Sequence, residues 1–135
     1  MQTFLPYSDF KKSAACLDNK RLNKQILEAK TIYDIVVENR MSGGWTSHPA
    51  TKMWRGYAEA LALYFNACLD EWKRRGKHHS YEKIPIADEN NVKMPPWLGD
   101  ERLHRSHRSN LLRKDEWYDK FGWTESWDMP YFWPV

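Results

Sequence analysis

The stretch that decides the fold is 47-SHPATKMWRGYAEALALYFNACLDEWKRRG-76. From Met53 to Trp72 its large apolar residues recur every three to four positions, which is the spacing of one face of an α-helix. One of the two residues before Pro49 is placed to cap the helix start, and proline suits a first turn because its missing N–H is not needed there. Three basic residues then complement the negative end of the helix dipole before Gly76 stops it. We therefore expect one long helix at the centre of the molecule.

Two further helices are predicted before this stretch. Apolar residues three to four positions apart indicate a short helix that starts at Ser8 or Asp9 and reaches about Leu17. A second apolar stripe, in a different register, runs from Asn19 to about Asn39. The change of register predicts a break between the two helices.

After the central stretch the pattern is less regular. Residues 77–99 hold three prolines and no sustained period, which predicts a long ordered loop. A further helix is expected from about Asp100 to Lys114, followed by an irregular, aromatic-rich tail that folds back over the core. Strand signals are almost absent. The predicted fold class is all-α: a single compact domain over residues 1–135, with three or four helices, a long ordered loop and an aromatic-rich C-terminal tail.

Composition limits the function classes. A length of 135 residues favours one domain. The mean hydropathy of −0.83 and the lack of a long apolar run exclude a membrane-spanning helix. With only two cysteines we expect buried or inert thiols and a reducing compartment, the cytoplasm. Eight Trp, seven Tyr and five Phe serve either the core, which we favour, or stacking on nucleic acid bases.

The predicted helix over residues 19–39 carries an unusual polar face. Lys24 and Glu28 are four residues apart and Arg21 is seven from Glu28, so the three side chains project together, with Lys20 beside them. One interpretation is a solvated face with one ion pair. The other interpretation is that Glu28 is a carboxylate inside a phosphate-binding surface. Its negative charge opposes DNA binding, so its presence there would indicate a chemical role.

The last predicted helix also has two different sides. Arg102, Arg105 and Arg113 share one side with two serines, and this spacing suits the phosphates of a nucleic acid backbone. A merely solvated face is the alternative. His104 and His107 lie on the apolar side, where we expect polar partners within the core. No carboxylate or thiol near these histidines completes a metal-ligand set, so no metal and no cofactor is expected.

His48 is a third candidate because it precedes a proline at a helix start. The positive end of a helix dipole favours a bound phosphate or a neutral imidazole. A plain capping role is the alternative. The net charge of +3 is mildly basic, so the placement of these cations matters more than their number.

Three motifs resemble the pyrimidine-dimer DNA glycosylase family. They are Leu17-x-x-Lys-Arg-Leu-x-x-Gln-x-x-Glu28, the helix end Tyr64–Gly76 (YFNACLDEWKRRG) and Trp117-Tyr-x-x-Phe-Gly122. Their order and spacing agree with the family and together they span most of the chain. The blocks HPATKMWRGY and PPWLGDERLHRSHRSNLLRKD are similar to a bacterial and phage branch of the same superfamily.

The resemblance implies a DNA glycosylase, with double-stranded DNA as its partner. Family members kink the duplex, flip a base out of the stack and attack the anomeric sugar carbon with the N-terminal α-amine. The base leaves, an imine forms and β-elimination nicks the strand. Glu28 matches the family's assisting glutamate, and Arg21 and Lys24 are expected to hold phosphates around the flipped nucleotide. The resemblance implies no metal or cofactor, and we expect a monomer without membrane contact.

The N-terminus departs from the family pattern. Gln2 is too large for ordinary methionine removal, so we expect the reactive amine to belong to Met1. Two alternatives stay open at this level: a glycosylase without lyase action, in which Glu28 activates water, and a non-catalytic helical DNA-binding or adaptor protein. The base lesion or modification that serves as substrate does not follow from the sequence.

Overall fold

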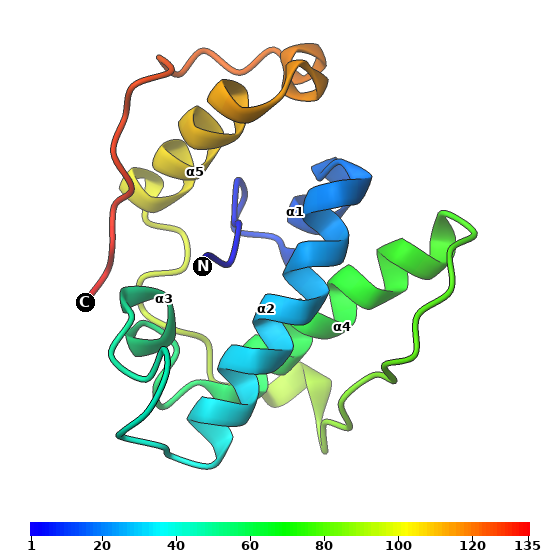
Figure 1. The fold of residues 1–135 in the computed structure, drawn as a ribbon, viewed down its shortest axis with the longest axis vertical. Helices are drawn as coiled ribbons and strands as arrows, with labels where there is room; N and C mark the ends of the chain where they lie inside the picture. The colour runs from blue at the N-terminus through cyan, green and yellow to red at the C-terminus, as the bar shows by residue number, and fades with distance from the viewer.

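The predicted all-α class is confirmed by a computed structural model that describes residues 1–135 (Figure 1). There is no strand. The chain forms five α-helices and two short 3-10 helices, which are α1 Phe10–Cys16, α2 Asn19–Val37, α3 Pro49–Lys52, α4 Ala58–Arg74, η1 Glu89–Asn91, α5 Glu101–Lys114 and η2 Glu116–Phe121. The predicted short first helix, the break after it and the helix that follows lie where expected. Asp9 caps α1 by accepting a hydrogen bond from the backbone N–H of Lys12 at 2.9 Å.

The prediction of one long helix from residue 49 to residue 75 is wrong. The chain instead forms α3 and α4, separated by a turn at Gly56, whose φ of +86° lies in the left-handed region that favours glycine. The interruption lets Trp54 leave the helical path and become fully buried, edge-on to the Trp97 ring at 4.9 Å between centroids. This split raises the number of α-helices to five, above the three or four expected.

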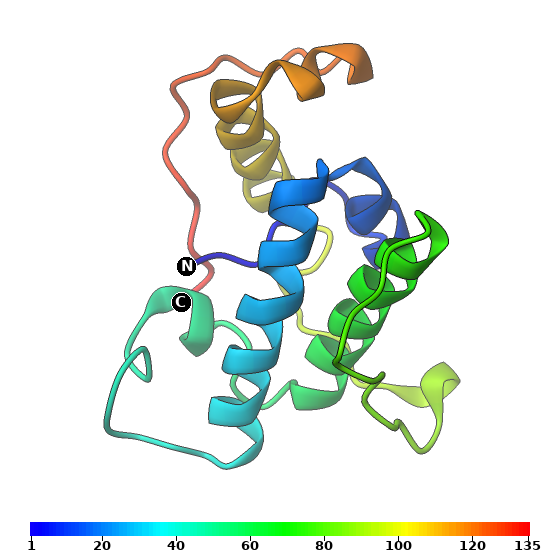
Figure 2. The same cartoon turned by 45° about the vertical axis from the view of Figure 1, so that its right-hand side comes forward.

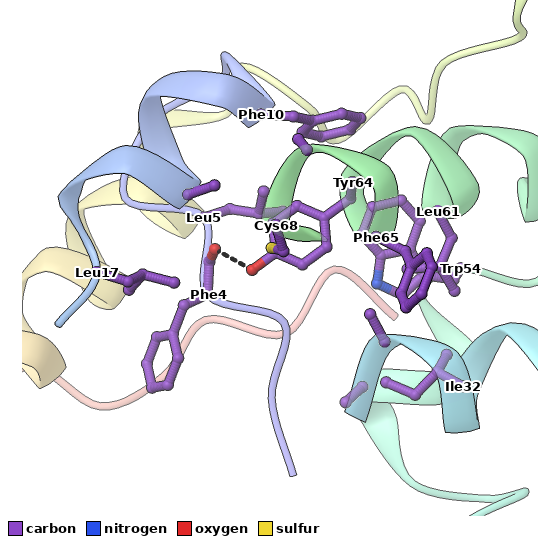
Figure 3. Packing of buried hydrophobic residues seen from close by; sticks show 14 of the residues in the cluster. Phe4, Leu5, Phe10, Leu17, Ile32, Trp54, Leu61, Tyr64, Phe65 and Cys68 are labelled. Atoms are coloured by element: carbon purple, nitrogen blue, oxygen red, sulfur yellow. Dashed lines mark hydrogen bonds between the residues drawn. The ribbon is translucent and has the colours of Figure 1, made fainter. Parts of the chain in front are cut away.

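Aromatic side chains build much of the core, as predicted. α4 packs against α2 and α1, and Trp54, Tyr64 and Phe65 are completely buried around it (Figure 3). Cys16 and Cys68 are free and buried, and burial raises the pKa of each thiol to about 12. The expectation of two buried, unreactive thiols is therefore confirmed.

The first six residues run as an extended segment through the interior, between α2 and α5 (Figures 1 and 2). Side chains satisfy the backbone of this segment, because it has no neighbouring strand. The Phe4 N–H donates to Gln25 Oε1 at 2.6 Å, and the Tyr64 hydroxyl donates to the Phe4 carbonyl at 2.7 Å (Figure 3). The Trp54 indole N–H donates to the Thr3 hydroxyl at 3.0 Å.

Two histidines of α5 hold the next residue of the segment, Leu5. The Leu5 N–H donates to His107 Nδ1 at 2.8 Å. His104 Nε2 accepts from the Gly99 N–H at 3.0 Å, so its Nδ1 carries the proton and donates to the Leu5 carbonyl at 2.7 Å. The predicted role of both histidines as polar core partners is confirmed. The contacts also fix the position of the N-terminus.

We expect His107 to make the fold sensitive to acid. Burial lowers the pKa of its imidazole from 6.5 to about 3, because the folded protein offers no place for a second proton. The unfolded chain binds that proton below about pH 6.5, so stability falls as the pH drops from 6.5 towards 3. At pH 4.5 the loss from this residue is on the order of 3 kcal/mol.

Chemical denaturation at pH 7 and pH 4.5 measures this effect. His107→Asn keeps an acceptor near the Nδ1 position and cannot titrate. The variant should be less stable than the wild type at pH 7 and lose less stability on acidification. An equal loss in both proteins would contradict the assignment.

The C-terminal tail covers the side of α5 that carries the arginines. Ser106 and Ser109, expected on an exposed or DNA-facing side, are buried, and this part of the expectation is wrong. The Phe132 N–H donates to Ser106 Oγ and the Met129 N–H to Ser109 Oγ, both at 3.1 Å. Small hydroxyl side chains leave room for the tail backbone and satisfy its polar groups. The tail is irregular and folded back along α5, as predicted (Figure 1).

Residues 77–99 form the expected ordered loop, interrupted only by η1. Asn66 of α4 holds its middle, since the side-chain amide donates to the Ile84 carbonyl and accepts from the Ile84 N–H. None of the helices combines the length and the apolar character needed to cross a lipid bilayer.

Candidate active site

A pocket of about 290 Å³ opens where the N-terminal segment, α2, the end of α5 and the tail meet. It is lined by Met1, Gln2, Phe4, Lys20, Arg21, Lys24, Gln25, Glu28, Lys114 and Tyr131. Five of these residues were predicted from the sequence to act in catalysis or DNA binding. The pocket contains one carboxylate and four cations.

Glu28 is the single carboxylate of the pocket. Its Oε2 accepts a hydrogen bond from Gln25 Nε2 at 3.2 Å and lies 3.4 Å from the Gln2 backbone nitrogen, which also donates to it. Lys24 and Arg21 form no ion pair with it, so the solvated ion pair considered from the sequence is not formed. A carboxylate held by neutral donors at a pocket wall keeps its charge available for chemistry.

Gln25 links Glu28 to the N-terminal segment. Its Nε2 also donates to the Gln2 carbonyl at 2.9 Å, and its Oε1 lies 2.7 Å from the Tyr64 hydroxyl, whose one hydrogen is shared between this oxygen and the Phe4 carbonyl. With the Phe4 contact described above, both hydrogens and both lone pairs of the buried amide are used. The Gln25 side chain thereby holds the N-terminal residues in a fixed position relative to Glu28.

Met1 lies at the edge of the pocket, with its sulfur 3.9 Å from the Thr51 hydroxyl of α3. The N-terminal charge lies close enough to His48 to affect the pKa of its imidazole. Burial lowers the pKa of the His48 imidazole, the positive N-terminus lowers it further and Glu28 opposes the change. The N-terminal amine and the Glu28 carboxylate therefore each lie within electrostatic reach of the His48 imidazole.

The cations of the pocket come from two helices. Lys20, Arg21 and Lys24 belong to α2, and Lys114 belongs to the last turn of α5. Burial lowers the pKa of Lys114, and the charges of Arg21, Arg113 and Lys24 lower it further. The lowered pKa shows that these positive charges lie close together. Such a concentrated positive region favours an anionic ligand such as phosphate.

Arg21 is held in place by two carboxylates. Its guanidinium lies 3.2 Å from Asp18 and 3.5 Å from Asp115. Asp18 is buried and accepts a 2.5 Å hydrogen bond from the Tyr118 hydroxyl, and the Trp117 indole donates to the Cys16 carbonyl at 2.9 Å. The motif around Trp117 thus contacts the motif that carries Glu28, although about 100 residues separate them along the chain.

None of the predicted DNA contacts on α5 is part of the pocket wall. The positive charge of Arg113 contributes to the lowered pKa of Lys114. The Arg113 guanidinium also donates to the Trp127 carbonyl and to the Asn110 side chain. Arg102 pairs with Asp100 at 2.7 Å, and Arg105 lies 3.5 Å from Glu125. The pocket wall includes neither Arg102 nor Arg105. Their contacts with DNA stay predictions.

His48 caps α3, as one of its two predicted roles required. Its Nδ1 accepts from the Ala50 N–H at 2.9 Å, and its ring lies edge-on to Trp133 at 5.7 Å between centroids. A phosphate contact from this residue stays a prediction.

Sequence reasoning did not assign Gln25, Lys114 or Tyr131 to the site. Gln25 gave a usable signal, since it is a polar residue beside Leu22 and Ile26 on the apolar side of its helix. Lys114 and Tyr131 gave none, because only the path of the tail and the angle of α5 bring them to α2.

Another cavity, of about 420 Å³, opens between α1, α4 and the 77–99 loop. Its charged residues are three acids and two lysines, which are Asp9, Asp70, Glu89, Lys11 and Lys83. This mixture does not favour a polyanion, and none of the predicted site residues lies there. No three His, Cys, Asp or Glu side chains in the structure are grouped so that they hold a metal ion.

The comparisons with known proteins agree with the motifs. A family model described as pyrimidine dimer DNA glycosylase matches residues 1–85, which include α1 to α4 and the predicted catalytic residues. Searches of curated proteins and of solved structures each find no match. The family match covers more than half of the 135 residues. The chain belongs to the pyrimidine dimer DNA glycosylase family.

Proposed function

We propose that this protein excises a damaged or modified base from duplex DNA, and that the α-amine of Met1 attacks the anomeric sugar carbon with assistance from Glu28. The observation that carries the proposal is the pocket itself. It joins the N-terminal residue to one carboxylate and surrounds both with four cations. A non-catalytic DNA-binding surface has no need for a carboxylate there, because its charge repels the phosphates.

The chemistry requires each of these groups. The amine lone pair forms a bond to C1′ as the glycosidic bond breaks, and the base leaves with the bonding electrons and takes up a proton. In this proposal Glu28 accepts the proton that the amine loses and returns it when the C1′–O4′ bond opens, which leaves an imine between protein and sugar. Loss of a C2′ proton then breaks the C3′–O bond and nicks the strand.

The surroundings suit this reaction. Lys20, Lys24 and Lys114 form no ion pair within the protein and are free to bind phosphates on either side of an extruded nucleotide. The Glu28 carboxylate is placed to stabilise positive charge that develops on the sugar.

Borohydride trapping tests the proposal. The protein is incubated with a duplex that contains a thymine dimer, and with a second duplex that contains an abasic site, in the presence of sodium borohydride. A covalent protein–DNA adduct is expected, because borohydride reduces the imine. Cleavage of the glycosidic bond without an adduct would indicate a glycosylase that uses Glu28 and water. Binding with neither product would indicate a non-catalytic DNA-binding protein.

We expect the unpaired lysines of the pocket to dominate DNA affinity. A plot of log affinity against log salt should have a slope of about −0.9 for each phosphate contact. Lys24→Gln should therefore reduce the slope by about 0.9. Arg105→Gln is the matched control, with a smaller expected change because Glu125 already neutralises that guanidinium. An affinity that does not vary with salt would contradict phosphate binding, and equal effects of the two substitutions would place DNA on both faces.

A further inference from the structure

The loop that joins α2 to α3, residues 39–47, presents two large apolar side chains to solvent. Trp45 is 49% exposed and Met41 is 70% exposed. Neither residue belongs to the hydrophobic core. Packing of the core, which accounts for most aromatic residues of this protein, therefore does not explain why a tryptophan stands at position 45.

The 39–47 loop is held in a fixed shape. Arg55 Nη2 donates to the Arg40 carbonyl at 2.6 Å and to the Thr46 carbonyl at 3.1 Å, which closes the base of the loop. Within it, the Thr46 hydroxyl donates to the Gly43 carbonyl at 2.9 Å. Trp45 has a φ of +67°, a left-handed conformation that a bulky residue adopts only at an energetic cost. Strain of this kind persists where the surroundings fix the backbone, and it is concentrated at functional positions.

The 39–47 loop lies next to the candidate active site. The His48 N–H donates to the Trp45 carbonyl at 3.2 Å, and the His48 imidazole is within electrostatic reach of the N-terminal amine and of Glu28. The helix that follows, α3, contacts the Met1 sulfur through the Thr51 hydroxyl at 3.9 Å. Figures 1 and 2 both show α3 beside the N-terminus. A duplex bound at the pocket therefore has this loop within its reach.

The charges around the 39–47 loop suit a polyanion. Residues 39–57 contain no Asp or Glu and include three cations, Arg40, Lys52 and Arg55. Arg40 pairs with Glu38, whereas Lys52 and Arg55 form no ion pair. A basic segment with exposed apolar side chains matches duplex DNA, which offers phosphates on the outside and flat apolar bases within.

We propose that the 39–47 loop is a wedge, and that Trp45, with Met41 on the same loop, enters the base stack and fills the space that the extruded nucleotide leaves. The proposal rests on the function proposed above. Extrusion breaks the stacking on both sides of a nucleotide, and apolar side chains inserted at a base step recover part of that loss and bend the duplex. A side chain presented by a rigid loop loses little freedom on insertion. Trp45 thus acts on the bases that stay in the duplex, and the pocket holds the one that leaves.

The test compares two duplexes of one sequence. One is undamaged, and the other contains a tetrahydrofuran abasic analogue, which leaves a gap in the stack and, without a C1′ hydroxyl, cannot form an imine. Trp45→Gly removes the side chain and keeps the loop, because glycine adopts the left-handed conformation freely. The variant should bind the tetrahydrofuran duplex on the order of tenfold more weakly than the wild type. Its affinity for the undamaged duplex should stay within about twofold, because the phosphate contacts are unchanged. Single-turnover cleavage of the glycosidic bond in a thymine-dimer duplex should also slow.

Three further variants serve as controls. Trp45→Phe keeps an aromatic ring and should recover most of the binding to the tetrahydrofuran duplex. Met41→Ala should weaken that binding as well. Met94→Ala makes the same chemical change at a residue that is 44% exposed on the 77–99 loop and lines the other cavity, and it should bind both duplexes like the wild type.

The possible outcomes separate the wedge from the proposed function. Selective loss with the tetrahydrofuran duplex, together with recovery in Trp45→Phe, would establish the wedge. Equal losses on both duplexes, or no loss on either, would overturn it, while cleavage by the wild type would leave the proposed function intact. A wild type that forms dimers in sedimentation while Trp45→Gly is monomeric would make the loop a contact between two copies and would also overturn the wedge. A wild type that binds both duplexes alike and cleaves no glycosidic bond would refute the proposed function, and the wedge with it.

Discussion

Glu28→Gln is expected to lower turnover by at least about 100-fold, the typical contribution of a group that transfers protons in the transition state. The substitution keeps the size of the side chain and an oxygen that accepts from Gln25 and from the Gln2 N–H. It removes the negative charge and the ability to take up a proton. Binding of DNA should hold or improve, since one repulsive charge disappears from a cationic pocket.

Single-turnover excision from a thymine-dimer duplex measures the chemical step, and thermal melting measures stability. Glu28 is partly exposed and lines the pocket. The structure gives it two hydrogen bonds to neutral donors, and Gln retains an acceptor for them, so we expect a stability loss below about 1 kcal/mol. Glu82→Gln is the control, because it makes the same chemical change on an exposed loop residue. A Glu28→Gln protein that melts early yet turns over normally per folded molecule would make Glu28 a structural residue.

Blocking the α-amine of Met1 is expected to abolish borohydride trapping. Acetylation, or a peptide joined ahead of Met1, converts the amine into an amide whose lone pair is delocalised and cannot attack carbon. An added peptide also meets the wall of a pocket of only about 290 Å³. The helices should remain folded, because the segment is held mainly at residues 3–5, beyond the blocked atom.

The control for this experiment is a removable extension whose cleavage leaves Met1 as the first residue. Trapping should be absent before cleavage and return after it, while the circular dichroism spectrum stays the same. If trapping persists after the α-amine is blocked, the nucleophile is a lysine of the pocket. Lys20, Lys24 and Lys114 are the three available, and individual Lys→Arg substitutions would identify which one reacts, since Arg keeps the charge and remains protonated.

The local features of this protein could be predicted from its sequence. Helical periodicity and caps located α1, α2 and α5, because both depend on residues within one or two turns of each other. The same rule placed Glu28, Arg21 and Lys24 on one face, since spacings of four and seven residues return to the same side of a helix. Buried histidines were anticipated because two polar residues lay within an apolar stripe.

The way in which these features combine depends on contacts between distant segments and could not be predicted from local patterns. The break at Gly56 depends on the burial of Trp54 against Trp97, a contact between residues more than 40 positions apart. The path of residues 1–6 shows no periodicity, and the side chains of Gln25, Tyr64 and two histidines of α5 hold it in place. Lys114 and Tyr131 reach the pocket only through the packing of α5 and the tail. Local spacing carries no information about such contacts, because they arise when distant segments share one core and satisfy one another's polar groups.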